Sequence, residues 1–131
     1  MNNIVLSIGS NSPDRHWQME SAIRYIKLKL KNVYSSSIYE TLALNGKDAS
    51  YLNAVIVADT DMSIDEAKTF FKQWETLCGR NKVSKIKGVI PIDVDIVVWN
   101  GAIIKERDFV AYYFSQGYYQ LFTLGKIKQS N

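Results

Sequence analysis

Two aspartates interrupt the otherwise apolar stretch Ile92-Asp93-Val94-Asp95-Ile96-Val97-Val98-Trp99. Successive side chains of a β-strand point to opposite faces, so this stretch predicts a strand with both carboxylates on one face. The opposite face would be apolar and would carry Ile92, Val94, Ile96 and Val98. The alternation therefore predicts a strand with one face for packing and one face that carries charge.

Asp93 and Asp95 would repel each other, because they are two like charges held close together on a partly desolvated face. The usual remedies are a shared proton, a lysine or arginine partner, or a divalent cation. Magnesium is the natural candidate, since it binds one or two carboxylates together with waters and substrate phosphates. The competing interpretation is a strand that emerges at a solvated rim, where water surrounds both carboxylates.

Turn residues and helix caps divide the rest of the chain into further elements. Strands are expected over 4–8, 33–40, 51–60 and 92–99, and helices over 13–30 and 64–79. Ser12 would cap the first helix with Pro13 at its first position, and Ser63 would cap the second. The segment 44–50 is a loop by its turn residues, and a long basic loop follows Gly79.

The order strand, helix, strand, strand, helix, strand predicts an α+β fold, the ferredoxin-like βαββαβ sandwich. Its sheet is antiparallel, and two helices cover one face of it. The strand over 51–60 would run antiparallel to the preceding one. Aromatic residues at helical spacing are interpreted as core packing, namely Trp17, Phe70, Phe71 and Trp74.

Length and composition limit the class of protein. The chain has 131 residues, of which 47% are hydrophobic, so residues 1–131 fit one domain. The sequence has no signal peptide pattern and no membrane-length apolar stretch, which predicts a cytoplasmic location. Cys78 is interpreted as a buried structural thiol, and His16, the single histidine, as a surface residue.

Positive charge gathers just before the aspartate strand. The formal net charge is only +3, yet one short stretch contains Arg80, Lys82, Lys85 and Lys87. Such a cluster suggests a ligand rich in phosphate. A solvated basic loop is the simpler interpretation of the same residues.

Five motifs in order resemble one family, the 6-hydroxymethyl-7,8-dihydropterin pyrophosphokinases of folate biosynthesis. The matches are Ile8-Gly9-Ser10-Asn11, Ser36-Ser37-Ile38-Tyr39-Glu40-Thr41, Tyr51-Leu52-Asn53-Ala54, Glu75 before Gly79-Arg80, and the Asp-x-Asp of the aspartate strand. Their spacing is similar to that of the family from Ile4 to Trp99. The resemblance identifies the chain as a divergent, C-terminally shortened member.

The resemblance implies a site for ATP, the co-substrate, and for magnesium. Asp93 and Asp95 would hold two magnesium ions against the triphosphate while the pterin hydroxymethyl group attacks the β-phosphorus. Arg80 and Lys82 would be cationic residues of the phosphate site, where Lys82 replaces an arginine of the family. Glu75 would belong to the nucleotide site, and Ile96 would pack near the adenine.

The resemblance also implies a slot for the pterin. Tyr51 would stack on its bicyclic ring, and Asn53 would hydrogen-bond to its polar edge. Backbone groups around Thr41, Leu42 and Leu44 would complete this slot. Tyr118 or Tyr119 would replace the phenylalanine with which the family closes the site.

Two family elements are missing from the sequence. The family's loop motif Arg-Trp-Gly-Pro-Arg is replaced by Ile86-Lys87-Gly88-Val89-Ile90, so two arginines are absent, and Lys85 and Lys87 would substitute in part. The stretch from Tyr112 to Tyr119 contains no Pro-His element and no arginine where the family has Pro-His and Arg-x-Phe. These losses predict reduced affinity, reduced rate, or both.

The sequence therefore leaves two alternative functions. One is a magnesium-dependent pyrophosphokinase of reduced activity or altered substrate; the other is a catalytically inactive paralogue that binds a pterin, a nucleotide or a protein partner. An RNA-recognition domain has the same element order, but the strand over 51–60 lacks its basic-Gly-aromatic signature, so no nucleic acid and no membrane is expected as a partner. The aromatic-rich C-terminal part leaves a homo-oligomer open.

Overall fold

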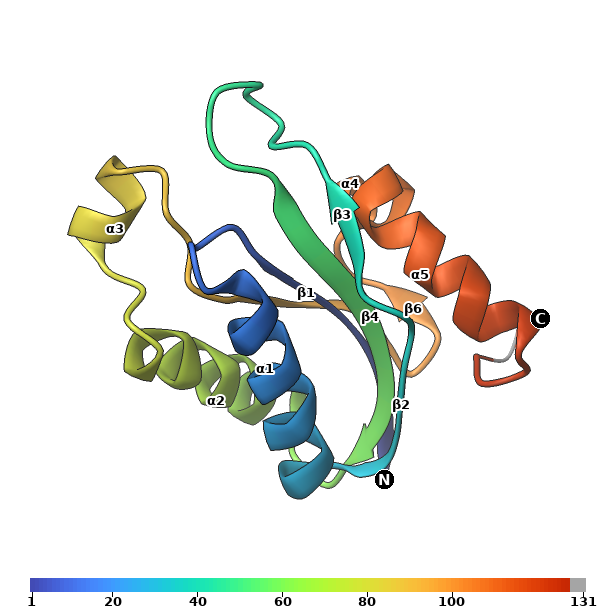
Figure 1. Ribbon diagram of the computed structural model, residues 1–131. Helices are drawn as coiled ribbons and strands as arrows, with labels where there is room; N and C mark the ends of the chain where they lie inside the picture. The colour runs from blue at the N-terminus through green and yellow to red at the C-terminus, as the bar shows by residue number, and fades with distance from the viewer. Residues whose placement is uncertain (128–131) are drawn as a thin grey trace.

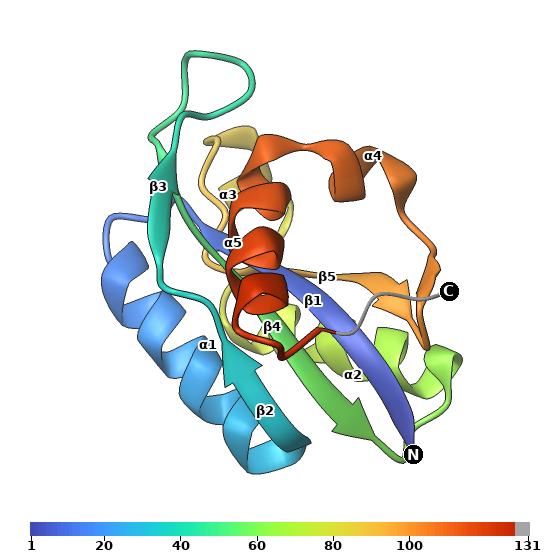
Figure 2. The ribbon, with the colours of Figure 1, turned by 90° about the vertical axis from the view of Figure 1, so that its right-hand side faces the viewer.

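A computed structural model describes residues 1–127 of the chain. It has one antiparallel sheet between two helical layers (Figures 1 and 2). The elements are β1 (Asn2–Ser10), α1 (Arg15–Lys29), β2 (Lys31–Ser35), β3 (Tyr39–Thr41), β4 (Tyr51–Thr60), α2 (Ile64–Leu77), α3 (Lys82–Ile86), β5 (Asp93–Trp99), β6 (Ala102–Ile103), α4 (Glu106–Val110) and α5 (Tyr112–Thr123). Within residues 1–127, no helix has the length and apolarity that crossing a membrane requires.

The central strand β1 pairs antiparallel with β4 on one side and with β5 on the other. The sheet order is β2-β4-β1-β5-β6, and β3 also pairs with β4. The predicted α+β, ferredoxin-like class is confirmed, and β4 has the bounds that the sequence predicts. The expected strand over 33–40 is two strands, because regular pairing with β4 is interrupted after Ser36, whose N–H still donates to the carbonyl of Val55. There the backbone N–H of Ser37 donates to Oε1 of Gln120 in α5 instead.

Helices α1 and α2 cover the first face of the sheet (Figure 1). Alternate residues of β1, β4 and β5 pack against them, as the strand period requires. The buried side chains include Ile4, Leu6, Ile8, Ala54, Ile56 and Ile96 from the sheet, Met19, Ala22 and Ile26 from α1, and Ala67, Phe71 and Trp74 from α2. Ser63 caps α2 as predicted, in a capping box with Glu66.

The first turn of α1 differs from the prediction. Helix α1 begins at Arg15, because the hydroxyl of Ser12 donates to Asp14 instead of capping the helix, and Pro13 lies in a turn. Trp17 is 64% exposed, so its assignment to the core is wrong. The buried face of α1 starts at Met19, and two helical residues correspond to about 200° of rotation, which turns Trp17 toward solvent.

Helix α5 covers the second face of the sheet, a role that the sequence analysis did not assign (Figure 2). Phe114 and Leu121 of this helix, with Ile127, pack on valines of three strands: Val5, Val55, Val57, Val97 and Val98. Only part of this face is covered. The remaining part, beyond the first turn of α5, carries the polar residues of β1, β4 and β5.

A bulge in β5 changes the direction of Val98. Val5 pairs with Val98 while the next residue, Leu6, pairs with Ile96, so Val97 is an extra residue in β5. Both Val97 and Val98 are buried against the α5 layer. The expectation that Val98 points away from the aspartates is therefore wrong, because the bulge interrupts the alternation after Ile96.

The segment after α2 contains a short helix, α3, where a basic loop was expected. Asn81 and Ser84 form a capping box that starts it. Cys78, just after α2, is half-buried, and burial together with the charge of Glu75 raises the pKa of its thiol. A raised pKa disfavours the reactive thiolate, in agreement with a structural cysteine.

Gly117 allows α5 to lie close to the sheet, and we predict that Gly117→Leu destabilises the fold. A Cβ at this position would meet Val55 Cγ2 at 2.7 Å and the hydroxyls of Ser36 and Tyr39 at 2.9 Å. Overpacking of this kind costs about 2–3 kcal/mol. Urea unfolding measures the loss, with Gln116→Ala on the exposed side of α5 as control. Equal stability of the two variants would contradict the close packing.

The buried hydroxyl of Tyr39 should make the protein less stable at alkaline pH. Its hydroxyl donates to the carbonyl of Tyr113 and accepts the N–H of Gly117, and burial raises the pKa of Tyr39 from 10.0 to about 12. Between those two values the unfolded chain has lost a proton that the folded chain keeps. The stability of the wild type relative to Tyr39→Phe should therefore fall by about 1.4 kcal/mol per pH unit. Urea titrations of both proteins at pH 9, 10 and 11 test this, and a constant difference would refute it.

Candidate active site

Asp93 and Asp95 lie between two pockets and line both of them. We call the first the slot, a cavity of about 310 Å³ on the face that α5 leaves open. We call the second the cleft, a cavity of about 590 Å³ bordered by α2 and by the segment that follows it. The two carboxylates share one face of β5, as the alternation predicts, and connect the two cavities.

The slot is formed by the polar ends of β1, β3 and β4 and by α4 and α5. Its lining comprises Ser7, Gly9, Thr41, Leu42, Ala43, Leu44, Asn45, Asp48, Tyr51, Asn53, Asp93, Asp95, Asp108 and Tyr113. Four of these residues are aspartates, and none is a lysine, arginine or histidine. A ligand that presents hydrogen-bond donors is therefore the complementary one.

Asn53 is fixed inside the slot. Its Nδ2 donates to Thr41 Oγ1 at 2.6 Å, which leaves Oδ1 as an acceptor beside Gly9. A Cβ at Gly9 would stand 3.2 Å from that oxygen, so the glycine gives the amide room. Tyr51 borders the same space; burial, followed by the charge of Asp93, raises the pKa of its phenol and keeps it neutral.

The cleft has the opposite charge. Five cationic residues line it, together with Phe71, Glu75, Thr76, the two aspartates, Val94 and Ile96; the cations are Lys68, Lys72, Arg80, Lys85 and Lys105. Such a cavity suits a ligand with several phosphates. The slot and the cleft thus present opposite charge on the two sides of Asp93 and Asp95.

Glu75 and Arg80 attach the end of α2 to β5. Gly79, at φ +100°, turns the chain back so that the N–H of Arg80 bonds to the carbonyl of Glu75. Arg80 Nη1 then donates to Glu75 Oε2 at 2.9 Å and to Asp93 Oδ1 at 2.6 Å. Glu75 Oε2 also accepts the N–H of Val94 at 2.7 Å. Burial opposes the charge of the guanidinium, but Asp93, with Glu75 and Asp95, more than compensates and raises its pKa.

Asp95 has a different partner, the ammonium of Lys105, at 2.5 Å from Oδ1. Burial, and then repulsion from Asp93, raise the pKa of Asp95 despite that partner. Of the three remedies considered for the pair, the structure shows the cationic partners. Residues 1–127 contain no group of three or more His, Cys, Asp or Glu placed to hold a metal. A metal there would have two carboxylate ligands and need oxygens from a ligand or water, which fits magnesium.

Asn11, from the Gly-Ser-Asn motif, fixes the segment that precedes the aspartates. Its Nδ2 donates to the carbonyl of Gly88 at 2.8 Å, and its Oδ1 accepts the N–H of Ile90 at 2.6 Å. A third bond joins the N–H of Asn11 to the carbonyl of Ile90. The end of β1 therefore holds the start of β5 in place.

Comparison with known proteins gives the family. The family model of 7,8-dihydro-6-hydroxymethylpterin-pyrophosphokinase (HPPK) matches residues 5–117. The chain belongs to the HPPK family. Similar proteins are a folate synthesis bifunctional protein of Chlamydia trachomatis, 34% identical over 75% of this chain, and the folic acid synthesis protein FOL1 of Dictyostelium discoideum, 30% identical over 82%. The aligned region covers 23% and 16% of those two proteins.

Most site residues predicted from the HPPK resemblance lie at the two pockets. Thr41, Leu42, Leu44, Tyr51 and Asn53 line the slot, and Glu75, Arg80, Lys85 and Ile96 line the cleft. Lys82 and Lys87 are exposed on or beside α3 and line neither cavity. The structure thus brings together all but two of the residues predicted from the HPPK motifs before Trp99.

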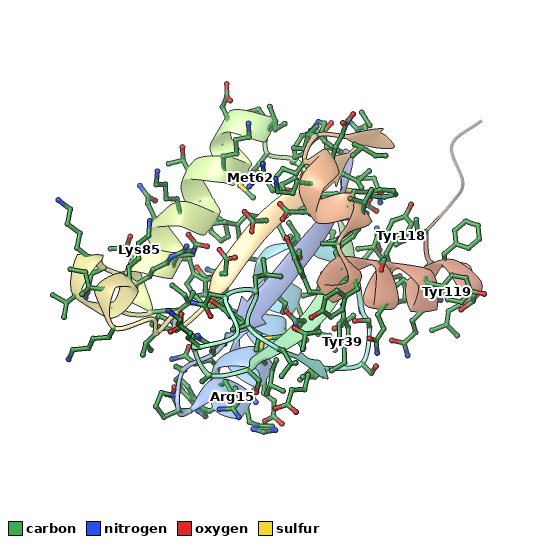
Figure 3. All side chains as sticks on the ribbon, turned by 90° about the horizontal axis from the view of Figure 1, so that it is seen from above. Arg15, Tyr39, Met62, Lys85, Tyr118 and Tyr119 are labelled. Carbon is green, nitrogen blue, oxygen red and sulfur yellow. The ribbon has the colours of Figure 1, made fainter. Side chains whose placement is uncertain are left out.

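Tyr118 and Tyr119 do not line the slot or the cleft. Tyr118 packs against Phe109 and Phe114 inside the α5 layer, and Tyr119 is 69% exposed. Figure 3 shows both on the side of the molecule opposite Lys85. Their predicted position is wrong, because only the first turn of α5 reaches the slot, through Tyr113, and Tyr118 and Tyr119 lie farther along the helix.

The sequence did not predict several residues that line the slot or the cleft, namely Ser7, Asp48, Lys105, Asp108 and Tyr113. One of them carried a signal in the sequence. Asp108 lies in Arg107-Asp108-Phe109, which has the family's Arg-x-Phe order but precedes the stretch from Tyr112 to Tyr119. Asp108 accepts a hydrogen bond from the hydroxyl of Tyr113, which joins α4 to α5 at the slot. Burial, followed by that bond, raises the pKa of Tyr113.

Loss of the Asn11 side chain should loosen the segment before β5. In Asn11→Ala, the N–H of Ile90 and the carbonyl of Gly88 lose their side-chain partners. Hydrogen exchange at the Ile90 amide should become about tenfold faster or more, because a strong hydrogen bond no longer protects it. Gln73→Ala, on the exposed side of α2, is the control. Unchanged exchange at Ile90 would show that Asn11 does not hold this segment.

Proposed function

We propose that this chain transfers pyrophosphate from ATP to 6-hydroxymethyl-7,8-dihydropterin, a step of folate biosynthesis. One observation carries the proposal: Asp93 and Asp95 border both an acidic slot and a basic cleft. A nucleotide in the cleft and a heterocycle in the slot would meet at these two carboxylates. Membership of the HPPK family supports the same pair of substrates.

The pterin suits the slot by its hydrogen-bonding pattern. A dihydropterin presents an amino group and ring N–H groups, and the slot offers Asn53 Oδ1 and the carboxylates as acceptors. The Tyr51 ring provides an apolar surface for stacking on the bicycle. Backbone groups of Thr41, Leu42 and Leu44 complete the wall. In this arrangement the hydroxymethyl group of the pterin points toward Asp93 and Asp95.

The triphosphate suits the cleft. Arg80 and Lys85 would bind phosphate oxygens, Glu75 would keep Arg80 oriented, and Ile96 would pack near the adenine. Lys82 and Lys87, outside the cleft, would contribute only their more distant charge. Two magnesium ions would be held by Asp93 and Asp95 with phosphate oxygens and water, where they neutralise charge on the β- and γ-phosphates.

The proposed reaction is a displacement at phosphorus. The hydroxymethyl oxygen forms a bond to the β-phosphorus, and the bond from that phosphorus to the oxygen bridging the α-phosphate breaks. AMP leaves with that oxygen, and the hydroxyl proton passes to solvent. The residues described here act by holding the two substrates in line and by balancing charge.

A binding module without catalysis is the second candidate. The observation that favours it is the segment Ile86-Lys87-Gly88-Val89-Ile90, which lacks both arginines and the tryptophan of the HPPK loop. Ile86 is 85% exposed and makes no wall of either cavity. Such a protein would keep the pterin slot and the nucleotide cleft but would release no AMP.

AMP formation separates the two candidates, and we predict that it requires Asp95. The wild type, given ATP, magnesium and 6-hydroxymethyl-7,8-dihydropterin, should form AMP only when the pterin is present. Asp95→Asn should reduce the rate about a hundredfold or more, because the metal loses a charged ligand. Asp61→Asn, in an exposed pair with Lys31, is the control and should match the wild type.

Calorimetric titration of magnesium–nucleotide and of pterin into the same proteins completes the test. Binding of both ligands without AMP would support the module. Full activity in Asp95→Asn would exclude the metal assignment. Absence of binding and of AMP in the wild type would overturn the proposed function.

A further inference from the structure

Lys105 is a cation of the cleft that no HPPK motif in this sequence predicts. Its ammonium lies 2.5 Å from Asp95 Oδ1, and its side chain lines the cleft beside Arg80, Glu75 and Ile96. The side chain keeps 43% of its surface exposed, and that of Asp95 keeps 27%. The ion pair is therefore open on the side of the cleft.

The ammonium has hydrogen-bonding capacity left. A lysine ammonium carries three N–H donors. Within residues 1–127, Asp95 is the only hydrogen-bond partner that the structure gives it. Two donors therefore remain for an anionic ligand in the cleft.

The backbone of Lys105 is held by two elements. Its N–H and that of Ile104 bond to the carbonyl of Val97, the bulged residue of β5. Its own carbonyl accepts the N–H of Phe109 at the start of α4. A side chain that starts from such a fixed backbone loses less conformational freedom on binding than one on a mobile segment.

The lysines of the α3 segment are placed differently. Lys85 and Lys87 are exposed and form no ion pair within residues 1–127, and only Lys85 lines the cleft. Figure 3 shows Lys85 at the outer edge of the molecule. Neither lysine has an ion-pair partner within residues 1–127 that orients it, as Arg80 and Lys105 have. Lys105, by contrast, contacts Asp95 directly.

We infer that Lys105 is a phosphate-binding residue, whose ammonium bridges Asp95 and the phosphate chain of the nucleotide and supplies charge that the missing loop arginines would otherwise provide. This inference rests on the proposed function. It assigns to the short connection between β6 and α4, where Lys105 precedes the first residue of α4, a role that the sequence patterns had placed in the loop before β5. The alternative is that Lys105 merely neutralises Asp95.

Binding of a non-cleavable nucleotide distinguishes these two roles. The probe is magnesium α,β-methylene-ATP, in which a carbon replaces the oxygen of the bond that breaks in the proposed reaction. Titrations would use the wild type, Lys105→Met, Lys105→Arg and the control Lys27→Met on the exposed side of α1. AMP, which lacks the β- and γ-phosphates, is the second probe. Thermal unfolding would verify that each variant is folded.

We expect Lys105→Met to weaken α,β-methylene-ATP about tenfold or more, because a charge-assisted hydrogen bond is lost. Its affinity for AMP should change less than about threefold. A general distortion of the cleft would instead weaken both nucleotides. Lys105→Arg should stay within about threefold of the wild type, as should Lys27→Met.

Three results would overturn the inference. They are unchanged or tighter nucleotide binding in Lys105→Met, an equal loss for AMP, and an arginine variant as weak as the methionine variant. A wild type that binds no magnesium–nucleotide at all would overturn the proposed function and, with it, the inference. Binding by the wild type together with an unaffected Lys105→Met would leave the proposed function standing and remove only the role of Lys105.

Discussion

Repulsion between Asp93 and Asp95 is the constraint around which the site is arranged. The two carboxylates stand on one face of β5, and each needs a positive partner. Arg80 follows α2 and Lys105 directly precedes α4, so the segments before and after β5 are both anchored to it. The pKa of Asp95 nevertheless stays raised, which shows that burial and repulsion exceed what one lysine offsets. A further cation at this place would relieve that remaining cost.

The bulge at Val97 divides β5 into two parts. Before it, Asp93 and Asp95 face the open part of the sheet; after it, Val97 and Val98 pack under α5. Gly117 lets α5 pack closely on the sheet, and the first turn of this helix forms one wall of the slot through Tyr113. Core packing and ligand space therefore occupy two parts of the same face of the sheet.

Local sequence patterns predicted the features of this structure that depend only on residues close together in the sequence. Alternation placed Asp93 and Asp95 together, and the Ser63 cap located α2, because both follow from neighbours in sequence. Val98 was misplaced because a bulge is a property of two paired strands. Trp17 was misplaced because apolar character alone does not show which side of a helix is buried. The sequence did not predict a role for Lys105, because its partner Asp95 lies ten residues away across a hairpin and no periodic pattern relates the two residues.

The position of the cations matters more for this chain than their number. A lysine on the exposed α3 segment must give up side-chain and backbone freedom to meet a phosphate, and its charge is screened by water until it does. A lysine fixed directly before α4 has already given up part of that freedom in the fold. In the proposed arrangement, one strand thus orients the metal ligands directly and, through Asp95 and Lys105, a phosphate contact as well. Loss of the loop arginines then removes charge from the α3 side of the site, while the contacts of Arg80 with Asp93 and of Lys105 with Asp95 remain.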